Sequence, residues 1–363
     1  MFTDASTGSA GKADSVSGVT IGVDVGGTKI AAGVVDGHGT ILRTARRPTP
    51  RHDSSAVLAE GADVVNELQA GVDGTVIGVG VGVAGGVDQS RSLVYFAPNL
   101  AWTHVPVRTV LEAATGLACV VENDGAAAAW AETRFGAGVG LQHVVMVTVG
   151  TGIGGGIVVD GRVLRGAYGV AAEIGHLNAV PNGRLCGCGR TGCWEQYASG
   201  NALVREAREL AAERRPEATV LLELGDGTPE GVQGAHITDA ARRGDPIAIE
   251  AFANVGAWLG RGLANLTAIV DPDAFVIGGG VSDAGDLILA SAQQTLSQSI
   301  FGGTNRPHPA LLLAKLGNDA GIVGAAVGIP LLKAVGLRDP VVKGFALGVG
   351  SHGIGTARAF EHS

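Results

Sequence analysis

Residues 143–166, HVVMVTVGTGIGGGIVVDGRVLRG, contain two apolar runs that are joined by a Gly-Thr-Gly turn and followed by a second glycine turn. Residues 19–48, VTIGVDVGGTKIAAGVVDGHGTILRTARRP, show the same order around a Gly-Gly-Thr turn. Runs rich in β-branched residues that are separated by short glycine turns predict antiparallel strands. Their recurrence predicts an internal duplication. We therefore expect two similar halves that face one another across a cleft.

Helices and buried strands alternate around these two segments, as the spacing of apolar residues indicates. Helices are predicted at 54–71, near 105–115, at 125–135, from about 201, and at 246–269, 285–300 and 320–334. Further strands are predicted at 76–85, 119–124, 274–280 and 310–316. This alternation is typical of the α/β class.

Two domains are expected, because 363 residues exceed the size at which a single hydrophobic core keeps growing. The first should span residues 19–136 and be completed by the last helix, taken to 320–335. The second should span residues 137–319. Residues 1–18 are small and polar, which predicts a disordered leader. Residues 336–363 are rich in glycine without a helical pattern, which indicates a tail that is partly disordered or lies on the surface.

Charge and hydropathy exclude two kinds of partner. The net charge is −8 and no run of Lys or Arg is present, so we expect no nucleic-acid partner. No apolar stretch reaches the roughly 20 residues that cross a bilayer, so no membrane partner is expected. The N-terminus does not have the charged and then apolar order of an export signal. These features predict a cytoplasmic protein.

Three of the four cysteines lie close together in the sequence CGCGRTGCWE, residues 186–195. His176, Cys186, Cys188 and Cys193 have the spacing H-x9-C-x-C-x4-C and are the donor types of a closed, structural zinc site. Glycines at 187, 189 and 192, between the cysteines, would let the backbone adopt positive φ angles and turn tightly round one ion. The alternative is a disulfide or a set of reduced thiols. Cys119, in an apolar strand, is interpreted as a core residue.

The two glycine turns have the composition of phosphate-binding loops. Each places consecutive backbone N–H groups beside a threonine hydroxyl, which suits a chain of phosphates. The residues concerned are Gly26, Gly27, Thr28 and Lys29 in the first turn, and Gly150, Thr151 and Gly152 in the second. A plain hairpin turn is an equal alternative for each. The pattern G-x-G-x-x-G carries no weight in this chain, because with 60 glycines it occurs four times.

Asp124 follows a predicted strand and is the candidate general base. A carboxylate at this position can accept a proton from an alcohol, while Asn123 binds a second hydroxyl. The alternative is that Asp124 caps the helix that follows. With Glu173, His176 and Glu195, these two residues make a set of hydroxyl-binding groups suited to a sugar.

The motifs DVGGTK at 24–29, Asn123-Asp124, VTVGTGIGGGIVVDGRVLRGAYGVAAEIGH at 147–176 and CGCGRTGCWE resemble those of the ROK family of bacterial sugar kinases and related repressors. The resemblance runs in order from about residue 20 to 335. It implies a duplicated, ribonuclease H-like fold of the actin-like ATPase kind. It also implies ATP-dependent phosphorylation of D-glucose at the 6-hydroxyl, which gives glucose 6-phosphate and uses Mg²⁺ with ATP.

The same resemblance implies roles for individual residues. Asp124 would take the proton from the 6-hydroxyl, and the other hydroxyls would be held by Gly85, Asn99, Asn123, Glu173, His176 and Glu195. The two turns would hold the ATP phosphates. Gly279 and Gly280 would lie near the adenosine. His176 would contact both the sugar and the zinc ion.

Several alternatives stay open within this family. The rival substrates are another hexose or N-acetylmannosamine, and a non-catalytic sugar sensor is the rival from another functional class. Polyphosphate is a less favoured donor because polyphosphate-using relatives tend to lack the cysteine loop. A repressor is not expected, since fewer than twenty residues precede the first strand. The resemblance implies a homo-oligomer, either a dimer or a tetramer.

Overall fold

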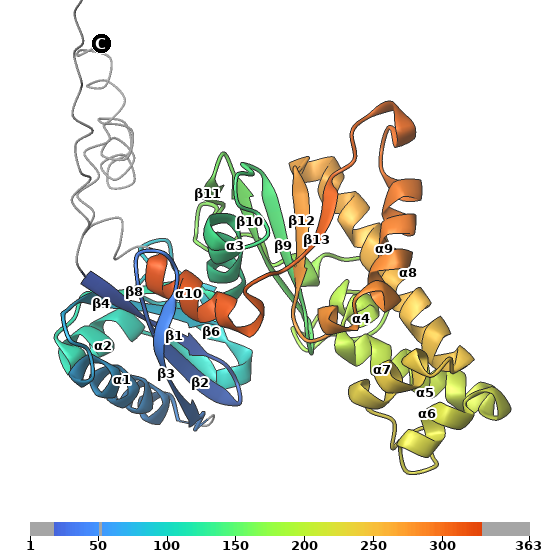
Figure 1. The fold of residues 1–363 in the computed structure, drawn as a ribbon, viewed down its shortest axis with the longest axis horizontal. Helices are drawn as coiled ribbons and strands as arrows, with labels where there is room; N and C mark the ends of the chain where they lie inside the picture. Colours follow the sequence, from blue (N-terminus) through green and yellow to red (C-terminus); the bar gives the residue numbers. More distant parts are fainter. Residues whose placement is uncertain (1–17, 51–52, 329–363) are drawn as a thin grey trace, which may run out of the picture.

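Two five-stranded sheets of the same topology form the two halves of the molecule (Figure 1). The computed structural model describes residues 18–50 and 53–328. The first sheet has the order β3-β2-β1-β4-β8, and the second has the order β11-β10-β9-β12-β13. In each sheet, the three strands that come first in the sequence pair antiparallel to their neighbours. The two later strands extend the sheet beyond the first of these strands and run parallel to it. The predicted duplication is confirmed.

The strands follow the two sequence repeats closely. The first sheet contains β1 (Gly18–Val25), β2 (Lys29–Val35), β3 (Ile41–Pro48), β4 (Thr75–Val83) and β8 (Cys119–Asn123). The second contains β9 (Val144–Val149), β10 (Ile153–Val159), β11 (Arg162–Val163), β12 (Ala274–Gly278) and β13 (Ala310–Leu313). The inner strands read as continuous apolar runs because both faces of each sheet are covered.

Each sheet carries helices on its outer face (Figure 1). On the first sheet these are α1 (Ser54–Ala70) and α2 (Val107–Thr115). On the second sheet the helical layer consists of α4 (Glu195–Ala198), α5 (Gly200–Glu213), α6 (Thr219–Leu224), α7 (Gly234–Arg242), α8 (Pro246–Val270) and α9 (Asp286–Ser299). Each half has its own main hydrophobic core. The core of the second half contains Phe252 of α8 and Phe275 of β12.

Two helices, α3 (Asp124–Phe135) and α10 (Ala320–Val327), lie between the sheets. A Cβ atom at Gly22 of β1 would come within 1.9 Å of the Ile322 carbonyl oxygen, so α10 rests directly on the first sheet. A Cβ atom at Gly125 of α3 would come within 2.4 Å of the Gly155 carbonyl oxygen in β10. Gly324 allows an equally close approach of α10 to α3. Glycine is required at these contacts because any side chain would separate the backbones.

The chain crosses between the halves after α3 and again before α10, and Glu132 binds both crossings. This buried carboxylate accepts hydrogen bonds from the backbone N–H of Ala137 at 2.7 Å, of Leu316 at 2.7 Å and of Lys315 at 3.2 Å. Three N–H donors satisfy most of the acceptor capacity of a carboxylate. Glu132 therefore ties the end of α3 to the segment that leads into α10.

Several elements differ from the sequence prediction. A three-stranded sheet of β5 (Gly86–Val87), β6 (Val94–Ala97) and β7 (Trp102–Val105) was not expected, and neither were α6 and α7. Gly18, which was assigned to the leader, opens β1. The rest of the predicted leader, the tail at 336–363 and the predicted helix beyond Gly328 lie outside the described residues. Among the helices of the described part, none has the length and apolar character of a membrane span.

Candidate active site

The candidate base stands where β8 passes into α3. Asn123 is the N-cap of α3, and its side-chain oxygen accepts a hydrogen bond from the N–H of Ala126 at 3.0 Å. Asp124 is the first helical residue, and its carboxylate accepts from the N–H of Gly125 at 2.8 Å. The capping role considered for Asp124 therefore belongs to Asn123. One oxygen of the Asp124 carboxylate bonds to the first-turn N–H of Gly125, which leaves the other oxygen for chemistry.

Burial raises the pKa of Asp124 above its ordinary value, against the lowering effect of its bond to the Gly125 N–H. Asp24, at the C-terminal end of β1, lies close enough to interact with it electrostatically. Burial, and then the Asp124 charge, raise the pKa of Asp24 to about 6, while Lys29 lowers it. The sequence prediction did not include Asp24. The available signal was a carboxylate in an apolar strand just before a glycine turn.

Glu173 of the second half lies close enough to Asp124, His176 and Glu195 to interact electrostatically with each of them. Desolvation raises the pKa of Glu173, His176 lowers it, and the charges of Asp124 and Glu195 raise it further. Glu173 precedes the short 3₁₀ helix Ile174–His176, and Glu195 opens α4. Nδ1 of His176 lies 3.9 Å from Oε1 of Glu195. The structure thus gathers the acidic groups that the sequence proposed for sugar binding.

His176, Cys186, Cys188 and Cys193 form one compact cluster whose donor atoms all lie within 4.8 Å of one another. Sγ of Cys188 and Sγ of Cys193 are 3.6 Å apart, and Sγ of Cys186 is 3.7 Å from Nδ1 of His176. A tetrahedral zinc ion with ordinary bond lengths would place two sulfurs about 3.8 Å apart, and a sulfur and a nitrogen about 3.6 Å apart. All four cysteines are free thiols. The cluster is compatible with zinc, and the disulfide alternative is not found.

Glycines shape the cysteine loop at two of the three expected positions. Gly189 and Gly192 have φ angles of 85° and 76°, in the left-handed region that favours glycine. At Gly192 a Cβ atom would also lie 1.8 Å from the carbonyl oxygen of Val180. Gly187 does not adopt a positive φ, and nothing lies within 4 Å of a Cβ atom placed there. The expected conformational need for glycine at 187 was wrong.

Glu195 connects the cysteine cluster with the second glycine turn. Its Oε1 lies 2.9 Å from Sγ of Cys186, and its Oε2 accepts from the N–H of Ile153 at 3.3 Å. A Cβ atom at Gly152 would lie only 2.3 Å from Oε2, so a larger residue here would displace the Glu195 carboxylate. The loop that carries the cluster therefore helps to fix the strand corner between β9 and β10.

The second turn also meets the start of α5 and the glycines after β12. The Gly150 carbonyl accepts from the N–H of Gly200 at 2.8 Å. Gly279 has a φ of 88°, and a Cβ atom there would lie 2.6 Å from the carbonyl oxygen of Val149. The structure thus places Gly279 beside Val149, the residue that precedes the second turn. Gly280 follows with open space around it.

The first glycine turn is held by Thr49, which follows the edge strand β3. The N–H of Gly26 donates to the Lys29 carbonyl at 3.0 Å, and the Thr49 hydroxyl donates to the Gly26 carbonyl at 2.8 Å. Thr28 and Lys29 are exposed. A Cβ atom at Gly27 would lie 3.3 Å from Cβ of Asn99, which places this exposed asparagine beside the turn.

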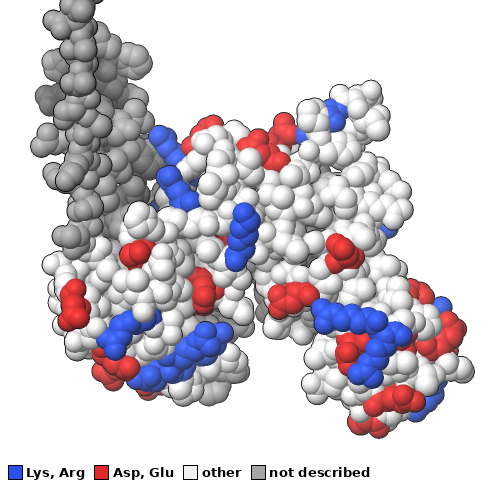
Figure 2. All heavy atoms as spheres, in the orientation of Figure 1, with Lys and Arg blue, Asp and Glu red and all other residues white. Residues whose placement is uncertain are grey.

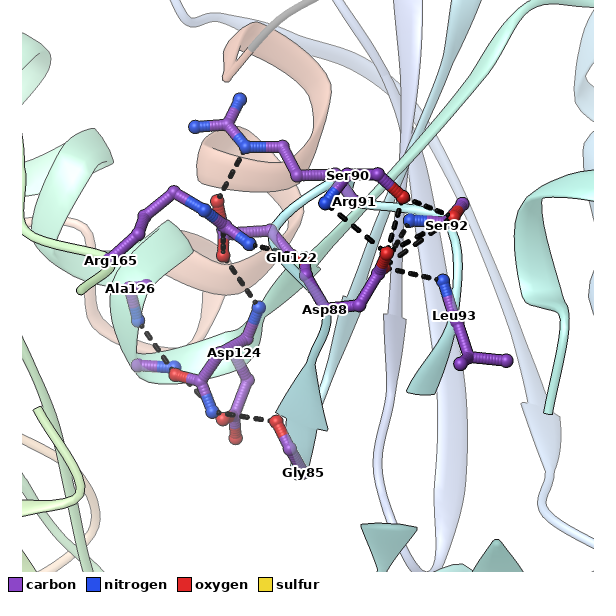
Figure 3. Close-up of polar contacts among 12 residues, drawn as sticks. Gly85, Asp88, Ser90, Arg91, Ser92, Leu93, Glu122, Asp124, Ala126 and Arg165 are labelled. Carbon is purple, nitrogen blue, oxygen red and sulfur yellow. Dashed lines mark hydrogen bonds and ion pairs between the residues drawn. The ribbon is translucent and has the colours of Figure 1, made fainter. Parts of the chain in front are cut away.

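Gly85 joins the base region through its carbonyl group, which accepts from Nδ2 of Asn123 at 3.2 Å (Figure 3). A Cβ atom at Gly85 would lie 2.4 Å from the Phe96 carbonyl oxygen, so the loop after β4 closes against β6. Asn123 therefore uses its side-chain oxygen for the helix cap and one amide hydrogen for this loop. Its remaining amide hydrogen is the group left to meet a ligand.

Comparison with known proteins gives a consistent result. The ROK family profile matches residues 20–330, and an LrgB-like family profile matches residues 318–363, most of which lie outside the described part. A glucokinase from Streptomyces coelicolor is 51% identical over 314 residues, covering 85% of this chain and 96% of the relative. A glucokinase from Thermotoga maritima is 37% identical, covering 84% and 95%.

A solved structure supports the same relationship. A ROK family glucokinase from Streptomyces griseus, in complex with glucose and AMPPNP, is 51% identical to this chain. The similarity covers 85% of this chain and 98% of the other, with a TM-score of 0.78.

Proposed function

This chain belongs to the ROK family, and we propose that it is a glucokinase that transfers the γ-phosphoryl group of ATP to the 6-hydroxyl of D-glucose. The observation that carries the proposal is that Glu173 of the second half interacts electrostatically with Asp124 of the first half and with Glu195 of its own half. Glucokinase relatives at 51% identity over most of the chain support the same substrate and donor.

Asp124 is the proposed proton acceptor. Its carboxylate takes the proton of the 6-hydroxyl as the sugar oxygen attacks the γ-phosphorus, the bond to the β,γ-bridging oxygen breaks, and ADP leaves. Glu173, Glu195, His176 and Asn123 hold the remaining hydroxyls, with Gly85 and Asn99 at the edge of the sugar site. Phosphoryl transfer depends mostly on positioning and charge neutralisation, so a site assembled from both halves suits it.

The glycine turns are proposed to hold the nucleotide. Backbone N–H groups of Gly26–Thr28 and Gly150–Gly152, with the hydroxyls of the two threonines and the ammonium of Lys29, would face the phosphates. Gly279 and Gly280 would lie beside the adenosine. The close approach of Gly279 to Val149 of β9 supports this assignment, because it brings the glycines after β12 next to the second turn.

Two metal ions accompany the proposed reaction. Zinc would be held by His176, Cys186, Cys188 and Cys193 in a closed structural role, and it would stabilise the loop that presents Glu195. Mg²⁺ would enter with ATP and neutralise charge on its phosphates. Mg²⁺ prefers oxygen ligands such as carboxylates. Asp24 offers such a ligand near the candidate base, because its charge interacts with those of Asp124 and Lys29.

A coupled assay across a panel of hexoses, with ATP and with polyphosphate as donors, tests this function. We expect D-glucose with ATP to be the best pair, mannose to be weaker and N-acetylmannosamine to be poor. A site that pairs each hydroxyl rejects sugars that leave its polar groups unpaired. Preference for N-acetylmannosamine or polyphosphate would overturn the assignment of substrate or donor. Sugar binding without any phosphorylated product would favour a sensor. The dimeric or tetrameric state and the cytoplasmic location stay predictions from the sequence.

A further inference from the structure

Glu122 directly precedes Asn123 and Asp124, and it is held by two arginines (Figure 3). Its Oε1 accepts from the backbone N–H of Asn123 at 3.0 Å and forms an ion pair with Nη1 of Arg165. Its Oε2 lies 3.4 Å from Nε of Arg91. The side chain is only 14% exposed, so this carboxylate is a fixed part of the segment that carries the candidate base.

Arg165 reaches Glu122 from the other half of the molecule. It follows β11, and its neighbour Leu164 donates its N–H to the carbonyl of Ile157 in β10 at 2.7 Å. The guanidinium is almost completely buried, with 9% exposure, and Nη2 donates to the carbonyl oxygen of Asp88 at 2.9 Å. One side chain of the second half is thus bonded to two segments of the first.

The Asp88 segment gives Arg165 a rigid partner. The Asp88 carboxylate accepts from the backbone N–H groups of Ser92 and Leu93, each at 2.7 Å, and from Ser90 (Figure 3). These bonds lower the pKa of Asp88, although desolvation opposes them. The Asp88 carboxylate therefore bonds within its own turn, and the Asp88 carbonyl oxygen is the group that bonds to Arg165.

The backbone of Arg165 also bonds to the loop that leads to Glu173, one of the proposed sugar-binding residues. Its carbonyl oxygen accepts from the N–H of Ala171 at 3.1 Å, which closes the loop that leads to Glu173. The same residue therefore holds the segment before Glu173 through its carbonyl and the segment before Asp124 through its guanidinium. Glu173 and Asp124 are the groups whose charges interact across the site.

We propose that Arg165 is a positioning residue for the phosphoryl transfer. Through Glu122 it fixes the distance between Asp124 and the sugar-binding side of the second half. The inference rests on the proposed kinase function. Because reactive groups must approach within a narrow range of distance and angle, a displacement of about 1 Å by a remote substitution lowers turnover by up to about 10²-fold.

Arg91 supplies a matched control. It contacts the same Glu122 carboxylate and is also largely buried, which lowers its pKa to about 10 in spite of Glu122. Arg91, however, lies in the first half, so its pair with Glu122 does not span the halves. Loss of either pair weakens the surroundings of Glu122, but only loss of Arg165 removes a contact between the two halves.

The test compares Arg165→Gln, Arg165→Lys and Arg91→Lys in the full chain. We expect Arg165→Gln to lower kcat by about 10-fold to 10²-fold with little change in the KM for glucose. Arg165→Lys should restore part of the loss, because lysine keeps the charge but cannot donate to Glu122 and Asp88 as a planar fork. Arg91→Lys should keep kcat within about twofold of the wild type. A wild-type kcat in folded Arg165→Lys, or an equal loss in Arg91→Lys, would overturn the proposal.

Amide hydrogen exchange separates this inference from the proposed reaction. In Arg165→Gln, or in Arg165→Lys if the first does not fold, exchange should become faster both at 122–125 and at 165–173. In Arg91→Lys it should stay unchanged at 165–173. Unchanged exchange in the Arg165 variants would overturn the positioning role. A wild-type protein that makes no sugar phosphate would instead contradict the proposed function.

Discussion

At the scale of single residues, the site depends on a carboxylate that is not the N-cap of its helix. Asn123 caps α3 and leaves Asp124, the next residue, without a cap bond. Burial raises the pKa of Asp124, which brings it closer to the pH at which a general base works best. The neighbouring Asp24 and Glu173 also have raised pKa values, so the pocket gathers acidic groups that a sugar and a cation would satisfy.

The pH dependence of kcat/KM follows from the sign of the Asp124 shift. Protonated Asp124 cannot accept the hydroxyl proton, so kcat/KM for glucose should rise with pH through a pKa above that of an ordinary aspartate. The measurement is kcat/KM from about pH 4.5 to about pH 8 at saturating Mg·ATP. Glu173→Gln should raise the KM for glucose and retain the acid limb. A profile that stays flat down to about pH 4.5 would contradict an essential buried carboxylate.

At the scale of elements, the cysteine loop and the Gly-Thr-Gly corner act as one unit. Glu195 lies between Cys186 of the cluster and Ile153 of β10, so disorder in the loop would be transmitted to the turn proposed for the phosphates. The loop itself has few large apolar side chains, and Cys188 is exposed. A bound ion would supply the stability that such a loop cannot obtain from a core of its own.

Substitution of the cluster should remove metal and activity together. We expect one zinc per chain in the wild type, and we expect Cys186→Ser or Cys188→Ser to lose both the zinc and glucose phosphorylation. Cys119→Ala is the matched control, because this buried thiol in β8 lies outside the cluster and its loss should leave the zinc content unchanged. Elemental analysis of purified protein checks these outcomes. A wild-type protein without zinc whose cysteines form disulfides would end the metal assignment.

The sequence predicted the elements whose patterns are long. Both glycine-cornered strand pairs, α1, α8 and α9 lie close to their predicted ranges, because their apolar periodicity extends over many residues. The sheet β5-β6-β7 was missed, since strands of two and four residues are too short to show an alternating pattern. The convergence of Asp124 with Glu173 could be named as a candidate, but the contacts of Arg165 with Glu122 and of Glu132 with Leu316 join positions far apart in sequence.

At the scale of the whole molecule, two halves of like topology meet through α3 and α10, and the surface is hollowed between them (Figure 2). Helix α3 belongs to this contact along its whole length. Asp124 stands at its first residue, and Glu132 near its end binds both chain crossings. A rotation of one half against the other would therefore be expected to pivot near Glu132. Closure of this kind would exclude water from the phosphoryl transfer.

Replacement of Glu132 should loosen the junction of the halves. Glu132→Gln keeps the shape of the side chain, but only one of its two terminal atoms can accept, so the bonds from Ala137 and Lys315 or the bond from Leu316 are lost. We expect the free energy of unfolding to fall by about 2–4 kcal/mol, since hydrogen bonds to charged groups are lost and N–H donors are left buried. Urea unfolding checks the value. Glu60→Gln, at a partly exposed side chain, is the control and should change stability by less than about 1 kcal/mol. An equally small change for Glu132→Gln would contradict the role of the junction.

The most direct test of the account is the turnover of Asp124→Asn beside its affinity for glucose. Asparagine preserves the size of the side chain and the Asn123 cap, so the variant should fold and bind glucose with an affinity close to that of the wild type. Without a proton acceptor, kcat should fall by about 10² to 10⁴-fold. A coupled assay gives kcat, and isothermal titration calorimetry gives the affinity for glucose, both from one preparation. A kcat close to that of the wild type in a variant that still binds glucose would contradict the central claim that Asp124 is the base.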